Sequence, residues 1–345
     1  MKIVADKDIP FLEGVLEPYA EVLYRKGNEI SPADIADADA LLIRTRTRCD
    51  ASLLEGSPVR MIATATIGMD HIDLEYCKEH GIHVENAAGC NAGGVMQYVF
   101  SALYGVGARK GIKLEDCTFG IIGVGHVGSR VEAMARYLGF NVLLCDPPRA
   151  AAEGPEKFCT LEYLLENSDI VTMHVPLDET TRGMADATFF ALMKPGAIFI
   201  NAARGEIIDE NALVQAAPKF GAVVIDTWCN EPDINEELLD VADIATPHIA
   251  GYSLQGKRNA TMMSVQALAS FFGIKDLLDF RPVDTDSNHE PVLLDLKGKN
   301  HGEIAAVFQY NYPIFTDDFR LRMEPHKFDK LRSEYQYRRD IYYID

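Results

Sequence analysis

Short apolar runs alternate with amphipathic stretches along the first ninety residues of the chain. Such alternation is typical of a parallel sheet whose strands are joined by crossover helices. The amphipathic stretches at residues 10–17 and 74–80 are predicted to be helices. The apolar runs are predicted to be strands at residues 2–5, 21–24, 40–44, 61–66 and 83–86.

A second alternating block lies between two long helices, predicted over residues 92–109 and 254–272. Its intervening helices are predicted over 127–138 and 211–217. Its strands are predicted at residues 118–122, 141–145, 170–174, 197–201, 222–226 and 243–245. Six strands with right-handed crossovers form one doubly wound sheet. The bracketing helices indicate that the chain leaves its first domain and returns to it, so we expect the substrate in the cleft between two domains.

The composition indicates a soluble globular protein of two or three domains, with 345 residues, 48% of them apolar. The net charge of −19 argues against nucleic-acid or anionic-membrane partners. The chain shows no signal peptide and no apolar run long enough to span a membrane. Its seven cysteines contain no Cys-x-x-Cys pair, so we expect reduced thiols in the cytoplasm, and neither a disulfide framework nor a metal site.

A Gly-x-Gly-x-x-Gly motif of Gly123, Gly125 and Gly128 stands between a predicted strand and a predicted helix. This context predicts a Rossmann-type turn that binds the pyrophosphate of a dinucleotide at the helix N-terminus, whereas the motif alone would also suit a plain glycine-rich turn. Asp146 ends the next strand and would bind the adenosine ribose, which favours NAD over NADP. Arg149 leaves a 2′-phosphate possible. Further cofactor contacts are predicted at His126, Val127, Val175, Ala202, Ala203, Arg204, Asp226 and Gly251.

Three polar residues, Arg204, Glu231 and His248, each follow one of three successive predicted strands. Ligands bind at the carboxyl ends of strands in such sheets, so the three should surround one cleft. His248 suits a general base that removes a hydroxyl proton, Glu231 would orient its ring, and Arg204 would bind a carboxylate. Taken singly, each could be structural, and His174 at another strand end is a second candidate base.

Arg44, Arg46 and Arg48 form the densest basic cluster of this acidic chain. If the preceding strand continues, their alternation places all three on one side, where they could bind a phosphate group. A solvated loop that balances nearby acidic residues is an equally good interpretation.

The glycine motif, the segment Asn-Ala-Ala-Arg204-Gly-Glu-Ile-Ile-Asp and the segment Thr-Pro-His248-Ile-Ala-Gly-Tyr resemble the D-isomer-specific 2-hydroxyacid dehydrogenases over about residues 1–275. The resemblance implies that Arg204, Glu231 and His248 are the catalytic trio and that NAD is the cofactor. Finer features, including residues 89–92, 146–149, 248–257 and 327–332, point to a member that oxidises a small phosphorylated 2-hydroxy acid. Substrate contacts are then implied at Thr45, Thr66 and Tyr252, and the basic cluster adds Arg44 and Arg46 as predicted contacts.

The predicted architecture is α/β with two doubly wound parallel-sheet domains. A Rossmann-type NAD-binding domain, residues 93–255, is inserted in a flavodoxin-like substrate-binding domain made of residues 1–92 and 256–280. Residues 281–345 would form a small C-terminal α+β domain, with a strand around Val292–Leu296 and a helix over 327–339. Six of the fourteen tyrosines lie there, which suits the dimerisation domain that the resemblance implies, although packing on its own chain is equally compatible.

Two other functions fit these residues. The first is another dehydrogenase of the same family, such as one that acts on 3-phosphoglycerate, because relatives that act on either substrate carry a similar arginine loop. The second is a protein that binds NAD as a sensor and has lost catalysis, and the presence of all three catalytic residues argues against it.

Overall fold

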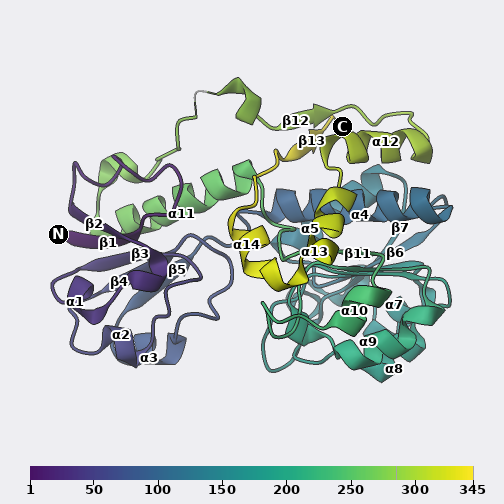
Figure 1. The fold of residues 1–345 in the computed structure, drawn as a ribbon, viewed down its shortest axis with the longest axis horizontal. Helices are drawn as coiled ribbons and strands as arrows, with labels where there is room; N and C mark the ends of the chain where they lie inside the picture. Colours follow the sequence, from purple (N-terminus) through teal and green to yellow (C-terminus); the bar gives the residue numbers. More distant parts are fainter. Residues whose placement is uncertain (285, 345) are drawn as a thin grey trace. The chain divides into compact units, whose positions relative to one another are not determined.

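The computed structural model describes residues 1–284 and 286–344 (Figure 1). The chain divides into two compact units, one of Met1–Asn91 with Ser253–Glu290, the other of Ala92–Tyr252 with Pro291–Asp345. Each unit is built on its own parallel sheet. The predicted α/β fold with two doubly wound sheets is therefore confirmed, while the predicted domain boundaries remain a prediction. Within the described residues, no helix is both long and apolar enough to cross a bilayer.

The first unit contains a five-stranded parallel sheet. Its strands are β1 (Lys2–Asp6), β2 (Glu21–Arg25), β3 (Ala40–Ile43), β4 (Met61–Thr64) and β5 (His83–Asn86). Their spatial order, β2-β1-β3-β4-β5, is that of the flavodoxin-like fold. Every residue of β3 and β4 is buried, because both faces of a central parallel strand are covered, and this explains why these segments show continuous rather than alternating apolar runs.

The helices of the first unit are short, apart from α11. They are η1 (Gly27–Glu29), α1 (Pro32–Ile35), α2 (Ala51–Leu54), α3 (Leu74–Glu79), α11 (Leu254–Phe272), η5 (Lys275–Leu277) and η6 (Ser287–His289). The helix predicted over residues 10–17 is wrong, since this segment consists of turns. Phe11 and Gly14 have φ angles of 60° and 82°, which a right-handed helix excludes, while Leu12 and Leu16 are buried in the core. The apolar spacing was thus correct for burial but not for a helix.

The second unit contains a six-stranded parallel sheet in the order β11-β10-β9-β8-β6-β7. Its strands are β6 (Thr118–Ile122), β7 (Asn141–Cys145), β8 (Ile170–Met173), β9 (Ile198–Asn201), β10 (Ala222–Ile225) and β11 (Ile244–Ala245). The order reverses at β6, which lies between β7 and β8, and such a switch point is where doubly wound folds bind ligands. Outside β7, where a Rossmann sheet commonly has one more strand, the backbone N–H of Cys159 bonds the carbonyl of Leu144 at 2.9 Å.

Helices cover both faces of this sheet. They are α4 (Ala92–Lys110), α5 (His126–Tyr137), α6 (Pro147–Glu153), η2 (Pro155–Lys157), α7 (Leu161–Asn167), α8 (Ala187–Leu192), η3 (Gly205–Ile207), α9 (Glu210–Ala216), η4 (Ala217–Lys219) and α10 (Glu236–Val241). Helix α4 is buried from Ala92 to Gly107. Its apolar surface therefore extends around the whole helix, because elements pack on it from more than one side.

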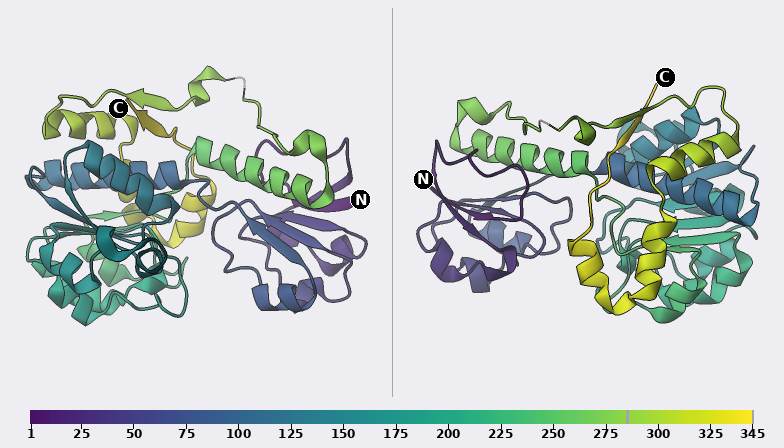
Figure 2. Two further views of the ribbon diagram at one scale, coloured as in Figure 1. Left: turned by 180° about the vertical axis from the view of Figure 1, so that it is seen from behind. Right: turned by 45° about the horizontal axis from the view of Figure 1, so that its top comes forward.

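The C-terminal segment, residues 291–344, packs on the second unit and covers α4. Its elements are β12 (Val292–Leu294), α12 (His301–Asn311), α13 (Phe315–Met323), η7 (Pro325–Lys327), α14 (Phe328–Ser333) and β13 (Ile341–Tyr343), with β12 and β13 paired in parallel. Helix α12 lies beside α4 (Figure 2), where the rings of Tyr104 and Phe308 stack 5.6 Å apart and Gln309 Nε2 donates to the carbonyl of Ser101 at 2.7 Å. The helix predicted over 327–339 ends at Ser333, so the prediction is wrong for residues 334–339.

Candidate active site

The glycine turn after β6 requires glycine at two of its three positions. Gly123 has a φ of 82°, and a Cβ there would lie 2.8 Å from the backbone of His174. A Cβ on Gly128 would lie 2.1 Å from the carbonyl oxygen of Gly123, because the first turn of α5 packs against the loop. These two residues therefore have the roles expected of a dinucleotide-binding turn, namely a tight reversal and close packing of helix on strand.

The middle glycine, Gly125, faces open space rather than packed backbone. It caps the N-terminus of α5, and a Cβ built there meets no atom within 4 Å. His126 is exposed and Val127 half-buried at the start of the same helix. Open space at the end of a helix, lined by unpaired N–H groups and the positive end of the helix dipole, fits the pyrophosphate of a dinucleotide. The residues present therefore fit NAD.

Asp146 fixes the other side of this turn. Its Oδ2 accepts from the N–H of Val124 at 2.8 Å, and its Oδ1 accepts from the N–H of Arg149 at 3.0 Å. Arg149 itself donates to Glu153 at 2.6 and 2.8 Å and to the carbonyl of Val124 at 2.7 Å. The guanidinium is thus already bound to a carboxylate and a carbonyl, which removes much of its capacity to receive a 2′-phosphate and favours NAD over NADP.

Glu231 and His248 form a hydrogen-bonded pair. The Nδ1 of His248 lies 2.8 and 3.0 Å from the two carboxylate oxygens of Glu231, and the two side chains are 23% and 18% exposed. Burial raises the pKa of Glu231, but the hydrogen bond and charge of His248, the charge of Arg332 and the N–H of Trp228 outweigh it and leave that pKa lowered. An ionised Glu231 requires a proton on Nδ1, so the Nε2 of His248 is left able to accept one.

The loop that carries His248 is held by a buried carboxylate. Asp226 is 1% exposed, and it accepts from the backbone N–H groups of Ile249 at 2.8 Å and Ala250 at 2.9 Å and from the hydroxyl of Thr246 at 2.7 Å. His248 has a φ of 54°, which is unusual for a residue with a side chain and needs this support. Sequence reasoning missed this structural role of Asp226, while its contact with NAD remains a prediction.

Arg204 lies in the loop after β9. The next residue, Gly205, packs against the backbone of the loop after β10. A Cβ on Gly205 would lie 2.0 Å from the backbone of Trp228, so only glycine allows this approach. Trp228 in turn donates through Nε1 to the carbonyl of Thr246 at 2.9 Å. The guanidinium of Arg204 donates to the carbonyl of Ala203 at 2.7 Å. The loops after β9, β10 and β11, which are neighbours in the sheet, are thereby joined.

The remaining positions predicted to contact the cofactor lie at strand ends of the same sheet. Val175 follows β8, Ala202 and Ala203 follow β9, and Gly251 lies in the loop after β11. The alternative base, His174, is unsuitable, because burial lowers its pKa to about 3, so that the ring has little tendency to take up and hold a proton. Its Nε2 is 3.0 Å from the hydroxyl of Thr172, as expected for a structural histidine.

The arginine loop of the first unit differs from the prediction. Because β3 ends at Ile43 and a turn follows, the strand alternation that would align three arginines does not apply. Arg48 is exposed and pairs with Asp50 at 2.7 Å, and its place in a phosphate clamp stays a prediction. Arg44 donates to the carbonyl of Asp8 at 2.9 Å, and Arg46 is exposed beside it.

The other residues predicted to bind substrate lie in different units. Thr45 is exposed in the same turn, and the hydroxyl of Thr66 lies 2.7 Å from that of Thr64, all within the first unit. Tyr252 belongs to the second unit, where its hydroxyl accepts from Arg332 Nε at 3.2 Å. Arg332 was missed by sequence reasoning, because nothing in the local pattern connects a helix in the last twenty residues with the loop after β11.

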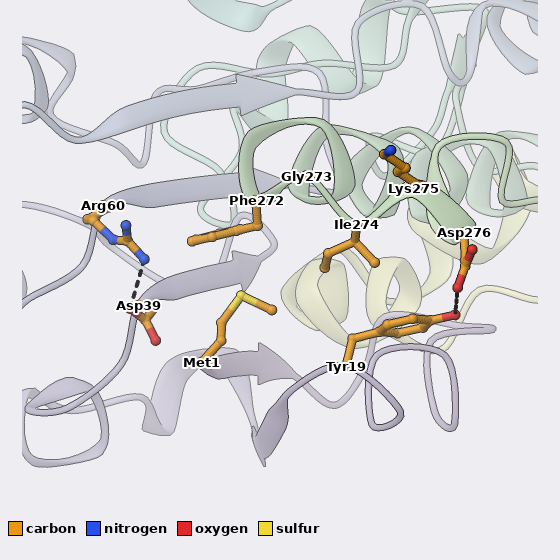
Figure 3. Close-up of a pocket in the computed structure, with 9 residues that line it drawn as sticks. All are labelled: Met1, Tyr19, Asp39, Arg60, Phe272, Gly273, Ile274, Lys275 and Asp276. Carbon is orange, nitrogen blue, oxygen red and sulfur yellow. Dashed lines mark hydrogen bonds and ion pairs between the residues drawn. The ribbon is translucent and has the colours of Figure 1, made fainter.

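A surface pocket of about 670 Å³ lies within the first unit (Figure 3). Asp39 and Arg60, joined across it at 3.0 Å, precede β3 and β4, so the pocket is at the amino ends of these strands. Its lining residues are Met1, Tyr19, Asp39, Arg60, Phe272, Gly273, Ile274, Lys275 and Asp276. None of these was predicted as a site residue, and doubly wound sheets bind their ligands at the carboxyl ends of the strands, which is the opposite side of the sheet. The pocket is therefore not the candidate active site.

Comparison with known proteins adds to this geometry. Residues 102–250 match the family model described as "D-isomer specific 2-hydroxyacid dehydrogenase, NAD binding domain". The erythronate-4-phosphate dehydrogenase of Bacteroides fragilis is 44% identical over 99% of this chain and 97% of its own length.

Solved structures give the same picture. The NAD+-bound 3-phosphoglycerate dehydrogenase of Entamoeba histolytica is 27% identical, with a TM-score of 0.67 over 82% of this chain and 99% of its own. The D-lactate dehydrogenase of Aquifex aeolicus, solved with NAD and lactic acid, is 25% identical, with a TM-score of 0.64 over 83% of this chain and all of its own. The cofactor and fold expected from the glycine motif are thus confirmed.

Proposed function

Because this chain belongs to the D-isomer-specific 2-hydroxyacid dehydrogenase family, we propose that it oxidises 4-phospho-D-erythronate to (R)-3-hydroxy-2-oxo-4-phosphobutanoate with NAD. The product class suits the biosynthesis of pyridoxal 5′-phosphate, the vitamin B6 cofactor. The single observation that carries the proposal is the His248–Glu231 pair at 2.8 Å, at the strand ends beside a dinucleotide turn. The substrate name comes from relatives such as the Bacteroides fragilis enzyme.

In the proposed reaction the 2-hydroxyl proton passes to Nε2 of His248 as the C2–H bond breaks. NAD, held at the turn of Gly123, Gly125 and Gly128, would supply the hydride acceptor for C2. Glu231 stabilises the imidazolium that forms, because its ionised carboxylate already holds Nδ1–H. Arg204 binds the substrate carboxylate through its planar guanidinium, which fixes C2 and polarises the developing carbonyl.

Substrate and cofactor specificity rest on separate groups. In the first unit, Arg44 and Arg46 are proposed to bind the substrate phosphate, and Thr45 and Thr66 to contact the substrate. In the second unit, Tyr252 is proposed to contact the substrate. The cofactor would be held by the turn of Gly123, Gly125 and Gly128 and by Asp146, with the strand-end residues named above. Because Asp146 would repel a 2′-phosphate and Arg149 is occupied by Glu153, NAD is expected rather than NADP.

A panel of D-2-hydroxy acids, assayed by NADH absorbance, tests the substrate. We expect the highest kcat/KM for 4-phospho-D-erythronate with NAD, a lower value for 3-phosphoglycerate, and a lower value again with NADP. Higher kcat/KM for 3-phosphoglycerate would instead favour a phosphoglycerate dehydrogenase. Binding of NADH without turnover of any member would favour the sensor function, which the intact His248–Glu231 pair argues against.

We further propose a cytoplasmic homodimer formed through the C-terminal segment. All seven cysteines are free thiols, as suits a reducing compartment. Large apolar side chains are exposed on this segment, with Tyr310 at 88% and Phe319 at 62%. Exposed aromatic residues of this kind favour an interface between copies.

Replacing Phe319 by Asp should convert the dimer to a monomer in sedimentation velocity, because a charge would be buried in the interface. Tyr163, which is 52% exposed on α7 outside the C-terminal segment, is the matched control, and Tyr163→Asp should leave the dimer intact. A wild-type chain that sediments as a monomer would contradict this assembly without affecting the proposed reaction.

A further inference from the structure

Arg338, in the C-terminal segment, forms hydrogen bonds with the loop that carries His248. Arg338 is 9% exposed and donates through Nη1 to the carbonyl of Ile249 at 3.0 Å and to that of Tyr252 at 3.2 Å. Its Nη2 also donates to the carbonyl of Ala250. Carbonyl oxygens are good acceptors for a buried guanidinium, so residues 249–252 and the C-terminal segment form one structure.

Arg332 lies in α14, ahead of Arg338 in the chain. It contacts the side chains of Glu231 and Tyr252. Its Nη1 lies 3.4 Å from Oε2 of Glu231, the same oxygen that lies 2.8 Å from His248. Its Nε donates to the hydroxyl of Tyr252 at 3.2 Å. The side chain of Arg332 is 24% exposed, so solvent screens these interactions only in part.

The chemistry of a guanidinium determines what these contacts can do. It carries N–H donors and no acceptor, so the phenol oxygen of Tyr252 must accept from it. The phenol proton is therefore directed away from Arg332, where an anionic oxygen of a ligand could receive it. In the same way, the positive charge favours the ionised form of Glu231, which is the form that orients His248.

We propose that Arg332 is a positioning residue of the active site, which holds the Glu231 carboxylate against His248 and makes the Tyr252 hydroxyl a donor to the anionic substrate. The inference rests on the proposed function in that it assigns these residues to a dehydrogenase reaction. It does not depend on which 2-hydroxy acid is the substrate, since Glu231 and His248 act on the hydroxyl that all of them share.

The test compares Arg332→Ala, Arg332→Lys and Lys330→Gln with the wild-type enzyme, using the D-2-hydroxy acid that the wild type oxidises fastest. Arg332→Ala should lower kcat by roughly tenfold to a hundredfold, because it removes charge-assisted hydrogen bonds, and should raise KM for the acid while NADH affinity is unchanged. Arg332→Lys should recover part of kcat, because it restores the charge without the planar fork. Lys330→Gln removes an exposed positive charge from the same helix, and wild-type kinetics are expected.

A second measurement separates positioning from general support of the fold. Guanidinium ion at low concentration should restore part of the kcat of Arg332→Ala and leave that of the wild type unchanged. Wild-type kcat and KM in Arg332→Ala would overturn the proposal, and so would a loss of activity that neither guanidinium nor Arg332→Lys recovers. If 4-phospho-D-erythronate is a poor substrate of the wild type, that result counts against the proposed function alone, and the comparison proceeds with the acid that is oxidised.

Discussion

Replacing His248 by Ala should lower kcat by about 10²–10⁴-fold while the affinity for NADH stays at its wild-type value. The reason is geometric: the Nδ1 of His248 is 2.8 Å from Glu231, so the ring has one nitrogen left to receive the hydroxyl proton, and the alternative base His174 is too deeply buried to act. Steady-state oxidation of the preferred 2-hydroxy acid and NADH fluorescence titration give the two quantities.

His326→Ala is the matched control for this experiment. His326 is exposed in η7 of the same unit, and its loss should leave both kcat and NADH affinity unchanged. Equal turnover by His248→Ala and the wild type would remove His248 from the mechanism. Loss of NADH binding together with turnover would instead indicate that the loop after β11 had lost its structure.

The second large effect is expected in the glycine turn, where two neighbouring substitutions should fail in different ways. In Gly128→Ala the new Cβ would lie 2.1 Å from the carbonyl oxygen of Gly123, so the backbone must move. We expect a loss of about 1–3 kcal/mol in the free energy of unfolding, seen as a Tm lowered by several degrees, together with weaker NADH binding.

In Gly125→Ala the added methyl group meets no protein atom within 4 Å, and the φ of −76° suits alanine. Tm should therefore stay at its wild-type value, whereas NADH affinity should fall at least about tenfold, because the methyl group occupies the space in which the pyrophosphate approaches the backbone. Calorimetry and NADH titration of both variants give the comparison. Wild-type NADH affinity in Gly125→Ala would place the pyrophosphate elsewhere.

The parts of this fold that could be predicted from sequence are those in which local pattern and tertiary structure agree. The central strands are buried on both faces and therefore appear as continuous apolar runs, and Gly123 and Gly128 are needed for backbone reasons that no side chain could satisfy. The positions of Arg204, Glu231 and His248 after successive strands followed from the same logic, because adjacent parallel strands end at one edge.

The predictions that failed depend on contacts between distant parts of the chain. The apolar spacing of residues 10–17 is satisfied by turns that bury Leu12 and Leu16, and a helix buries the same positions equally well. The arginine alternation failed because β3 ends at Ile43, one residue before Arg44. The roles of Asp226 and Arg332 arise from hydrogen bonds that join separate loops, which no local window of sequence contains.

The anchoring of the loop after β11 by Arg338 has a consequence for genetics. Truncating variants that leave all catalytic residues in place are usually regarded as mild, because terminal segments of a domain are often poorly ordered. Here a premature stop codon just before the codon for Arg338 would leave every residue of the Arg204, Glu231 and His248 trio encoded. The carbonyls of Ile249 and Tyr252 would nevertheless lose their common donor. Such an allele should therefore be scored as a catalytic lesion, although it leaves the trio itself unchanged.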